Sequence, residues 1–519
     1  MQRLKRKNRL HIMPFFLVFC LLYLISFCLI SVSAIAQDEE SFISSSEFKQ
    51  GYDPDSASYS AVAEAVYWEH AASMALSSGD QGKALESYKE SLKLINEAIQ
   101  LDPRSSFLQS KLSELSITTE DYDTAISAAN SAVELDPSNA DAYYFSGYLK
   151  IRKSQDKVGA LADFKKAAEL DPDHLNANRY LGILAFESGN YKLASSAYAR
   201  IVKLRPYDPE LRYRLALSYS LSGEVSKAID GYKATIMLNE SHIKAHYDLA
   251  NLYARLGRNR EAIDETLIVL TLSRTQNDPN VMLFLAQLYI ALGDYDKGIA
   301  IGDSVLRRNG TKKAISAEAL YLLGISFKEK GEKKFADENL QKSIDIYKNL
   351  LEEDATKNVR LNYDIAKVYD AKGEQNFAKK HLEKFIYLKS DDSEVSNAYN
   401  YLGYIMVEQN KNLDIAVTYI EKAIAMEPGN GVFRDSLGWA YFKLGKIDEA
   451  VVELEKAVEL TPNDSDVHEH LGEVYLAKGR EYTQKAIAEW AKAIELKPSK
   501  TALKQKLDRL NAGQNSGSE

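Results

Sequence analysis

Apolar positions recur along most of this chain with the spacing of amphipathic helices, and the helices they predict come in pairs that repeat at a regular interval. Leu101-Asp102-Pro103 and Leu135-Asp136-Pro137 stand 34 residues apart, and later units close in the same way. Prolines end seven units, at positions 103, 137, 172, 206, 428, 462 and 498. A period of 34–36 residues made of two helices indicates a repeat architecture.

The repeating unit resembles the tetratricopeptide repeat. The unit at residues 431–462 shows the family pattern in Leu437, Gly438, Tyr441, Gly445, Ala450 and Pro462. In this register the chain carries about twelve repeats between residues 63 and 498. The resemblance implies an all-α fold, a right-handed superhelical solenoid. Neighbouring units must stack in it because one helix pair cannot bury its apolar face alone.

Small residues have definite positions within the unit. Gly at position 8 and Ala at position 20 allow the two helices to approach closely, and Gly at position 15 supplies turn conformations that other residues disfavour. Six glycines fill position 8: 147, 182, 324, 403, 438 and 472. Nine fill position 15: 79, 189, 223, 257, 293, 331, 373, 445 and 479. The scarce glycines (26) and prolines (11) therefore have structural roles.

The N-terminal segment has the pattern of an export signal. Residues 3–9 are basic, Phe15–Val32 is an uncharged apolar run, and Ser33-Ala34-Ile35-Ala36 offers a cleavage site after Ala36. Residues 1–36 are thus a signal peptide, or else residues 13–36 remain as a membrane anchor. Both alternatives place the rest of the chain outside the cytoplasm.

The remaining boundaries follow from the repeat pattern. A polar, Ser-rich tether covers residues 37–62 and leads into the repeat array at 63–498. We expect a capping helix at 499–510 and a polar tail at 511–519.

Composition narrows the class of function. Lys and Arg number 65 against 74 Asp and Glu, a net charge of −9. Nucleic acid is therefore not the expected partner, because binding to phosphates depends on clustered basic residues. Cys20 and Cys28 both lie in the apolar leader, which leaves the rest of the chain without a disulfide or a thiol nucleophile. With no phosphate loop, nucleophile elbow or kinase signature, we expect no enzyme activity, no catalytic residues and no cofactor.

The resemblance places the first helix of each repeat along a groove, with positions 5 and 9 among those that point into it. Seven of the ten residues singled out below are tyrosines, which combine apolar area with a hydroxyl that can bond to a peptide. The candidate partner-binding residues are Tyr144, Tyr148, Tyr213, Tyr247, Asn251, Tyr321, Tyr363, Lys367, Tyr404 and Trp439. Either they contact a partner peptide or helix, or they pack between adjacent repeats. Trp439 is the strongest single candidate, because tryptophan is enriched among binding anchors.

Two histidine pairs were the candidates for a metal site. His242 and His246 are four residues apart on one predicted helix, but no HExxH-type general base accompanies them. His468 and His470 fall on different faces of their helix. We therefore expect no metal.

The charged groove positions leave further alternatives open. Asp466, Glu469 and Glu473 in the last repeat either meet a basic partner segment or form a solvated face. Lys244 and Asn251 fall at two positions of the clamp with which chaperone-binding members hold a carboxylate terminus. The remaining clamp residues are not in place.

Residues 400–404, 435–441 and 470–475 also resemble envelope members of the family, some of which are lipoprotein adaptors for a carboxy-terminal processing protease. Phe27 stands before Cys28 where a lipobox needs a small residue. The prediction is an exported bacterial scaffold that binds a protein or peptide partner. The alternatives are a membrane-anchored assembly or secretion factor, an adaptor for an envelope processing protease, and an enzyme that carries repeats.

Overall fold

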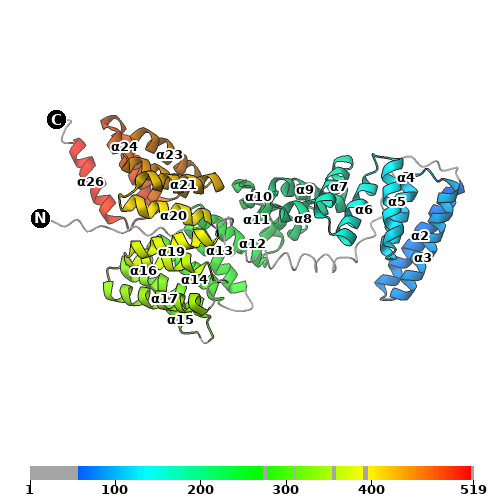
Figure 1. The fold of residues 1–519 in the computed structure, drawn as a ribbon, viewed down its shortest axis with the longest axis horizontal. Coiled ribbons are helices and arrows are strands. Elements are labelled where there is room, and N and C mark those ends of the chain that lie inside the picture. The colour runs from blue at the N-terminus through cyan, green and yellow to red at the C-terminus, as the bar shows by residue number, and fades with distance from the viewer. Residues whose placement is uncertain (1–56, 273–277, 309, 354–357, 390–394, 516–519) are drawn as a thin grey trace. The chain divides into compact units, whose positions relative to one another are not determined.

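The computed structural model describes residues 57–272, 278–308, 310–353, 358–389 and 395–515, and every regular element in these ranges is a helix. The chain forms two compact units that divide between Glu240 and Ser241. In each unit the helices lie side by side as antiparallel pairs, and most helices pack most extensively on their own hairpin partner (Figure 1).

The first unit contains five helix pairs. They are α2 (Ala57–Ser77) with α3 (Gln81–Leu101), α4 (Ser106–Thr118) with α5 (Tyr122–Leu135), α6 (Ala140–Leu149) with α7 (Lys157–Leu170), α8 (Leu175–Glu187) with α9 (Tyr191–Leu204), and α10 (Pro209–Leu221) with α11 (Val225–Leu238). Helix α3, with 21 residues, is longer than the other second helices of this unit, which have 14.

The second unit contains seven pairs and one final helix. They are α12 (Ile243–Arg255) with α13 (Asn259–Leu272), α14 (Pro279–Leu292) with α15 (Tyr295–Leu306), α16 (Lys313–Glu329) with α17 (Lys333–Glu353), α18 (Leu361–Lys372) with α19 (Gln375–Leu388), α20 (Val395–Glu408) with α21 (Leu413–Met426), α22 (Gly431–Lys443) with α23 (Ile447–Leu460), α24 (Ser465–Lys478) with α25 (Thr483–Leu496), and α26 (Thr501–Asn515).

The two helices of a pair touch at position 8, where no room is left for a methyl group. A Cβ on Gly472 would lie 2.4 Å from Cδ1 of Trp490, and one on Gly438 would lie 2.6 Å from Cγ of Leu454. Trp490 itself is buried. The absence of a side chain therefore brings the backbone of the first helix onto the large residue of the second.

The turns within the pairs depend on left-handed backbone. All nine position-15 glycines have positive φ, for example +80° at Gly79 and +86° at Gly373. The second helices often begin with a side-chain cap, as where Asn190 accepts a hydrogen bond from the N–H of Leu193 at 3.2 Å. Repeat 2 has no glycine at this turn, and Glu120 adopts φ +62° in its place.

Two short irregular turns explain where the period departs from 34. A π-helical turn, η2 (Lys150–Ser154), lengthens the end of α6 and accounts for the 35-residue spacing of Pro137 and Pro172. A 3₁₀ turn, η3 (Arg480–Tyr482), precedes α25 in the repeat that spans 36 residues. Both insertions lie at intra-repeat turns, so the helix pairs on either side keep their register.

The second unit also contains contacts between turns that are far apart in sequence. A Cβ on Gly257, after α12, would lie 2.3 Å from the backbone oxygen of Asn463, before α24. A Cβ on Gly293, after α14, would lie 2.9 Å from Oγ of Ser499, before α26. The last repeats of this unit therefore touch its first two repeats.

These observations confirm an all-α array of twelve helix pairs. The predicted signal or anchor (1–36) and most of the predicted tether (37–62) lie outside the described residues. Among the described helices, none combines the length and the apolar character that crossing a membrane requires.

Replacing Gly472 with alanine should destabilise the second unit by about 1–3 kcal/mol, because the new methyl group overlaps the rigid Trp490 ring. Urea denaturation followed by circular dichroism measures this change. Gly429→Ala is the matched control, since a Cβ at Gly429 meets nothing within 4 Å. Equal stability of the two variants would contradict the proposed close approach.

Candidate functional site

The groove candidates of the first unit, Tyr144, Tyr148 and Tyr213, are all buried. The ring of Tyr144 lies 5.9 Å from that of Phe164 in its own repeat and 5.0 Å from His174 at the start of the next. Burial raises the pKa of Tyr144 well above its usual value, so its hydroxyl stays protonated. That hydroxyl has no hydrogen-bond partner among the described residues.

In the second unit, Tyr321, Tyr363 and Lys367 belong to a buried charged cluster. Nζ of Lys367 lies 3.5 Å from the carboxylate of Glu318 and 3.3 Å from that of Asp364, and it stands 5.1 Å over the ring of Tyr321. Burial raises the pKa of Glu318, and the charge of Lys367 opposes that rise. One lysine therefore faces two carboxylates in this cluster inside the protein.

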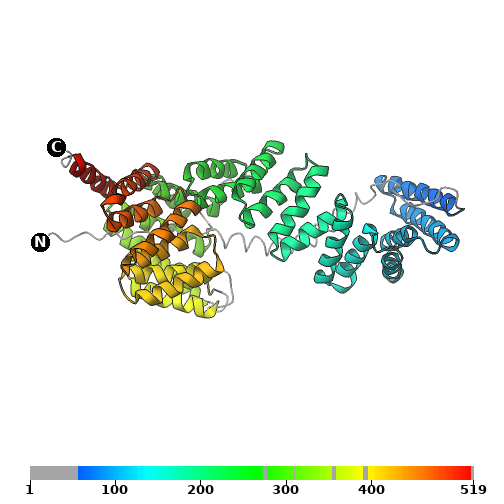
Figure 2. The ribbon, with the colours of Figure 1, turned by 90° about the horizontal axis from the view of Figure 1, so that it is seen from above.

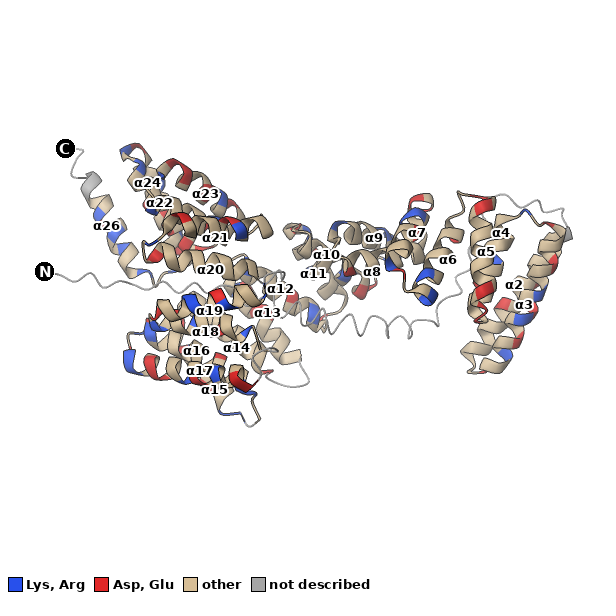
Figure 3. Cartoon of the chain, viewed as in Figure 1, with Lys and Arg blue, Asp and Glu red and all other residues tan. Residues whose placement is uncertain are grey.

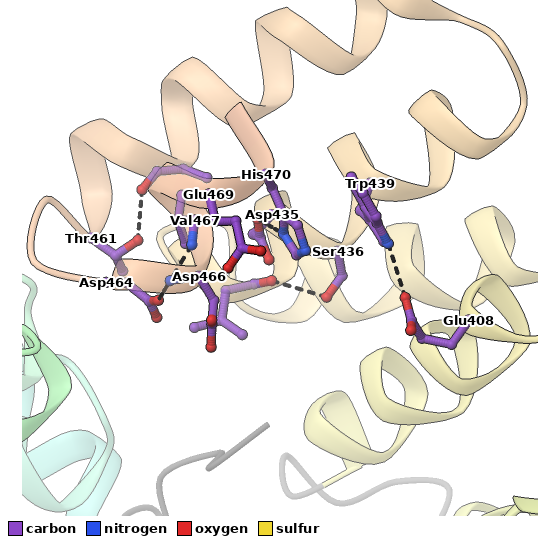
Figure 4. A network of polar contacts seen from close by, with 12 residues as sticks. Glu408, Asp435, Ser436, Trp439, Thr461, Asp464, Asp466, Val467, Glu469 and His470 are labelled. Carbon is purple, nitrogen blue, oxygen red and sulfur yellow. Dashed lines mark hydrogen bonds and ion pairs between the residues drawn. The ribbon is translucent and has the colours of Figure 1, made fainter. Parts of the chain in front are cut away.

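Trp439 lies beside polar side chains from three consecutive repeats (Figure 4). Its Nε1 donates to Glu408 at 3.0 Å, and its ring stacks on His470 with centroids 4.2 Å apart. Nδ1 of His470 lies 2.7 Å from the carboxylate of Asp435, and both of these side chains are almost fully buried. The network fixes Trp439 between its neighbours and leaves it 7% exposed.

The remaining candidates differ in how accessible they are. Tyr404 is buried. Tyr247 on α12 is half-buried, with its ring edge-on to Phe284 at 6.2 Å. Asn251, one turn further along α12, is 8% exposed, and its Oδ1 has no hydrogen-bond partner among the described residues. Nine of the ten predicted residues are buried, and Tyr247 is partly exposed.

The structure thus distributes the ten candidates over both units and places most of them between adjacent repeats. Whether any of them also binds a partner stays a prediction. Their burial means that most can offer a partner only an edge of the ring or a single polar atom.

The side chains that form hydrogen bonds or ion pairs with residues of the groove face were not predicted from the sequence. They lie about one repeat away from the residues they bind: Gln287 with Glu318, Tyr401 with Asp370, Trp439 with Glu408, His470 with Asp435, and Lys500 with Asp466. The separations are 31–35 residues, so the repeat period itself was the available signal.

The candidate metal ligands each have a separate structural role. Nδ1 of His242 accepts the N–H of Ala245 and caps α12, whereas Nδ1 of His246 lies 2.6 Å from Glu265. In the described ranges, no group of three His, Cys, Asp or Glu residues is arranged to hold a metal ion.

The acidic groove positions of the last repeat meet the chain's own C-terminal lysines. Lys500 pairs with both Asp466 and Glu469, and Lys506 lies 3.1 Å from the carboxylate of Glu473. The basic segment that these acids could attract is therefore supplied, in this structure, by α26 and the turn before it.

Two side chains near the start of α24, Asp464 and His468, have raised pKa values. Burial, together with Asp466 and Asp435, raises the pKa of Asp464 to about 6. Asp464 caps α24 by accepting hydrogen bonds from the N–H groups of Asp466 and Val467 (Figure 4). Burial lowers the pKa of His468, but its contacts with Glu489 and with the carbonyl of Pro462 outweigh this and leave the pKa raised.

Family models match several stretches of the chain. Residues 117–173 and 152–209 match a family described as tetratricopeptide repeat, and residues 438–479 match one described as TPR repeat. Residues 187–267 match a family described as anaphase-promoting complex, cyclosome, subunit 3. These matches fall on helix pairs that share one register. The chain is a tetratricopeptide repeat protein.

Known proteins are similar to this tetratricopeptide array over different lengths. The TPR repeat-containing protein MJ1428 of Methanocaldococcus jannaschii is 22% identical over 74% of this chain and 67% of its own length. The TPR repeat-containing thioredoxin TTL4 of Arabidopsis thaliana is 32% identical over 16% of this chain, which spans only 12% of that protein. A structure of Naa15/Naa10 bound to HypK-THB aligns with 82% of this chain and 68% of its own, at 16% identity and a TM-score of 0.41.

The raised pKa of Asp464 makes the stability of the last tetratricopeptide repeats depend on pH. A folded-state pKa of about 6, above the usual value, means that the stabilising contribution is present at low pH and is lost as pH rises through 6. Asp464→Asn keeps the helix cap and removes the charge. We expect it to match the wild type near pH 4 and to exceed its unfolding free energy by about 1–2 kcal/mol above pH 7.

Chemical denaturation at intervals between pH 4 and 8 measures the difference. Asp448→Asn is the control, because the side chain of Asp448 is 84% exposed. A stability gain that does not vary with pH would contradict the assignment to Asp464.

Proposed function

We propose that this chain is a non-enzymatic scaffold that holds a protein or peptide partner along the groove face of its array. Tetratricopeptide proteins generally mediate protein–protein interaction, and the fold is typically non-catalytic. The observation that supports a binding role here is Asn251, whose buried Oδ1 lacks a hydrogen-bond partner among the described residues. Buried polar atoms are nearly always paired, so an unpaired one at a groove position is suited to an incoming donor.

Tyr247 gives that position a second contact. It lies one helical turn before Asn251 on α12, and its partly exposed side chain offers apolar area beside the amide. A peptide backbone N–H could donate to Asn251 Oδ1 while an apolar side chain of the partner covers the ring of Tyr247. The two residues together suit a segment of extended peptide.

The charges of the array favour a partner of modest net charge. Acidic and basic residues are interspersed along the helices of both units (Figure 3). On the groove face, Glu318 pairs with Lys367 and Asp466 pairs with Lys500. Because these charges are already compensated, binding would depend mainly on backbone hydrogen bonds and apolar contact.

Replacing Asn251 with alanine should weaken partner binding about tenfold or more, because the partner then loses its hydrogen bond in a buried position. A photo-crosslinking residue at position 247 identifies the partner in cells, and calorimetry with the purified pair measures the affinity. The same crosslinker at Tyr207, which is 83% exposed in a turn, is the control. Unchanged affinity of a folded Asn251→Ala variant would refute the site.

We further propose that the scaffold acts in the bacterial cell envelope. The support is the basic head, apolar run and Ala34-Ile35-Ala36 end of residues 1–36. The candidate roles are a released adaptor, including one for an envelope processing protease, and a membrane-anchored assembly or secretion factor.

Mass spectrometry of the chain recovered from its host distinguishes these roles. An N-terminus at Gln37 is expected for the released adaptor, whereas Met1 would indicate anchoring through residues 13–36. Recovery of the chain with Met1 in the soluble cytoplasmic fraction would contradict both.

A further inference from the structure

The second unit closes on itself at two turns. Gly257, just after α12, lies against the backbone oxygen of Asn463, just before α24. Gly293, after α14, lies against the side chain of Ser499, before α26, and a hydrogen bond joins Ser499 to the side chain of Tyr295. The helices between these closure contacts follow a curved path in both views of the ribbon, which brings the last turns of the unit back to its first (Figures 1 and 2).

The closure contacts differ in kind from the contacts that stack the repeats. Consecutive repeats of this unit share buried apolar side chains, as Leu322, Tyr363 and Leu402 do in one hydrophobic cluster. The closure contacts instead join glycine backbone to a backbone oxygen and to a serine side chain, with one hydrogen bond between hydroxyls. Apolar burial is the largest favourable term in folding. The closure contacts should therefore break before the stacking does, which makes an open form of the unit accessible.

The two ends of the groove face meet at the closure contacts. Helix α12 carries Tyr247 and Asn251 and leads directly into the turn at Gly257, whereas α24 carries the last groove positions and begins just after Asn463. The first helices of the seven repeats therefore run round from α12 to α24 and are joined there. A closed turn of this kind admits a free chain end through its openings, but an internal segment of a folded partner needs the two ends to separate.

We propose that the closure contacts form a gate: the second unit alternates between the closed turn described here and an open form, and the open form admits a partner to Tyr247 and Asn251. This gate rests on the groove binding proposed above and adds the step by which the partner enters. A partner that prefers the open form shifts the equilibrium toward it by the difference between its affinities for the two forms.

The first test measures the distance across the closure contacts in the full-length chain by double electron–electron resonance. Spin labels are placed at Arg260→Cys and Glu459→Cys, which are exposed on α13 and α23, after the two native cysteines have been replaced by serine. Gly257→Ala adds a Cβ that would lie 2.3 Å from the oxygen of Asn463. It should raise the ratio of open to closed molecules about tenfold or more, which appears as a longer distance.

Gly331→Ala is the matched control for backbone strain. Gly257 has φ +69° and Gly331 has φ +83°, so alanine is disfavoured at both, but a Cβ at Gly331 meets nothing within 4 Å. The control should keep the wild-type distance. Equal distances in the two variants would overturn the proposal.

Tyr295→Phe is a milder second variant, and circular dichroism shows whether each variant remains folded. It removes the hydroxyl that is bonded to Ser499 and should raise the ratio of open to closed molecules about threefold or more. A wild-type distance in this variant as well would leave the closed turn permanent and would contradict the gate.

The second test asks whether closure restricts access to the groove and needs no partner. In the background without native cysteines, Tyr247→Cys reacts with N-ethylmaleimide or with a maleimide on a polyethylene glycol chain of several kilodaltons. Relative to the small reagent, the polymer should react about tenfold more slowly there than at Tyr207→Cys, which replaces a side chain that is 83% exposed. Adding Gly257→Ala should remove most of this difference, and adding Gly331→Ala should not.

Two results of the second test would overturn the gate. One is a polymer that reacts as readily at position 247 as at position 207 in the otherwise wild-type chain. The other is an opening by Gly257→Ala that leaves the polymer rate at position 247 unchanged. An Asn251→Ala variant with full affinity would refute the groove site proposed above without altering either measurement, so the two failures are distinguishable.

Discussion

The rest of the array depends on the close approach of two helix backbones within each repeat. Gly472 against Trp490 and Gly438 against Leu454 show the constraint, since neither contact leaves space for a methyl group. A pair joined in this way is thin and cannot bury its own apolar face, so the next pair must cover it. The interface between consecutive helix pairs, which we call the seam, therefore recurs along the chain at the repeat period. It forms most of the hydrophobic core in both units.

The seam explains why the groove face is built from compensated charges. A carboxylate at a groove position is partly removed from water by the next repeat, which is costly unless a donor comes with it. The donor often comes from the neighbouring repeat, as His470 does for Asp435 and Lys500 does for Asp466. In the proposed binding role, recognition of a partner falls to Asn251, whose Oδ1 has no hydrogen-bond partner among the described residues, and to the partly exposed Tyr247 beside it.

Which features of the fold could be predicted from the sequence depends on how far apart along the chain the interacting residues lie. The helix pairs, the left-handed turns at Gly79 or Gly373 and the close approach at Gly472 are local or nearest-neighbour features, and each has a fixed place in the repeat. The contact of Gly257 with Asn463 has no such pattern, because it depends on small rotations summed over many repeats. Burial of the tyrosines was ambiguous for a related reason: a groove position and a seam position share one helix face.

That shared face limits how function can be assigned in a tetratricopeptide protein. Trp439 is of a residue type that is common among binding anchors, yet its indole donates to Glu408 and stacks on His470. Its removal would therefore disturb three repeats whether or not a partner binds. Tyr247 is partly exposed, and Oδ1 of Asn251 has no hydrogen-bond partner among the described residues. A change at Asn251 removes no hydrogen bond that its Oδ1 makes in this structure, so loss of binding there could be attributed to contact with the partner.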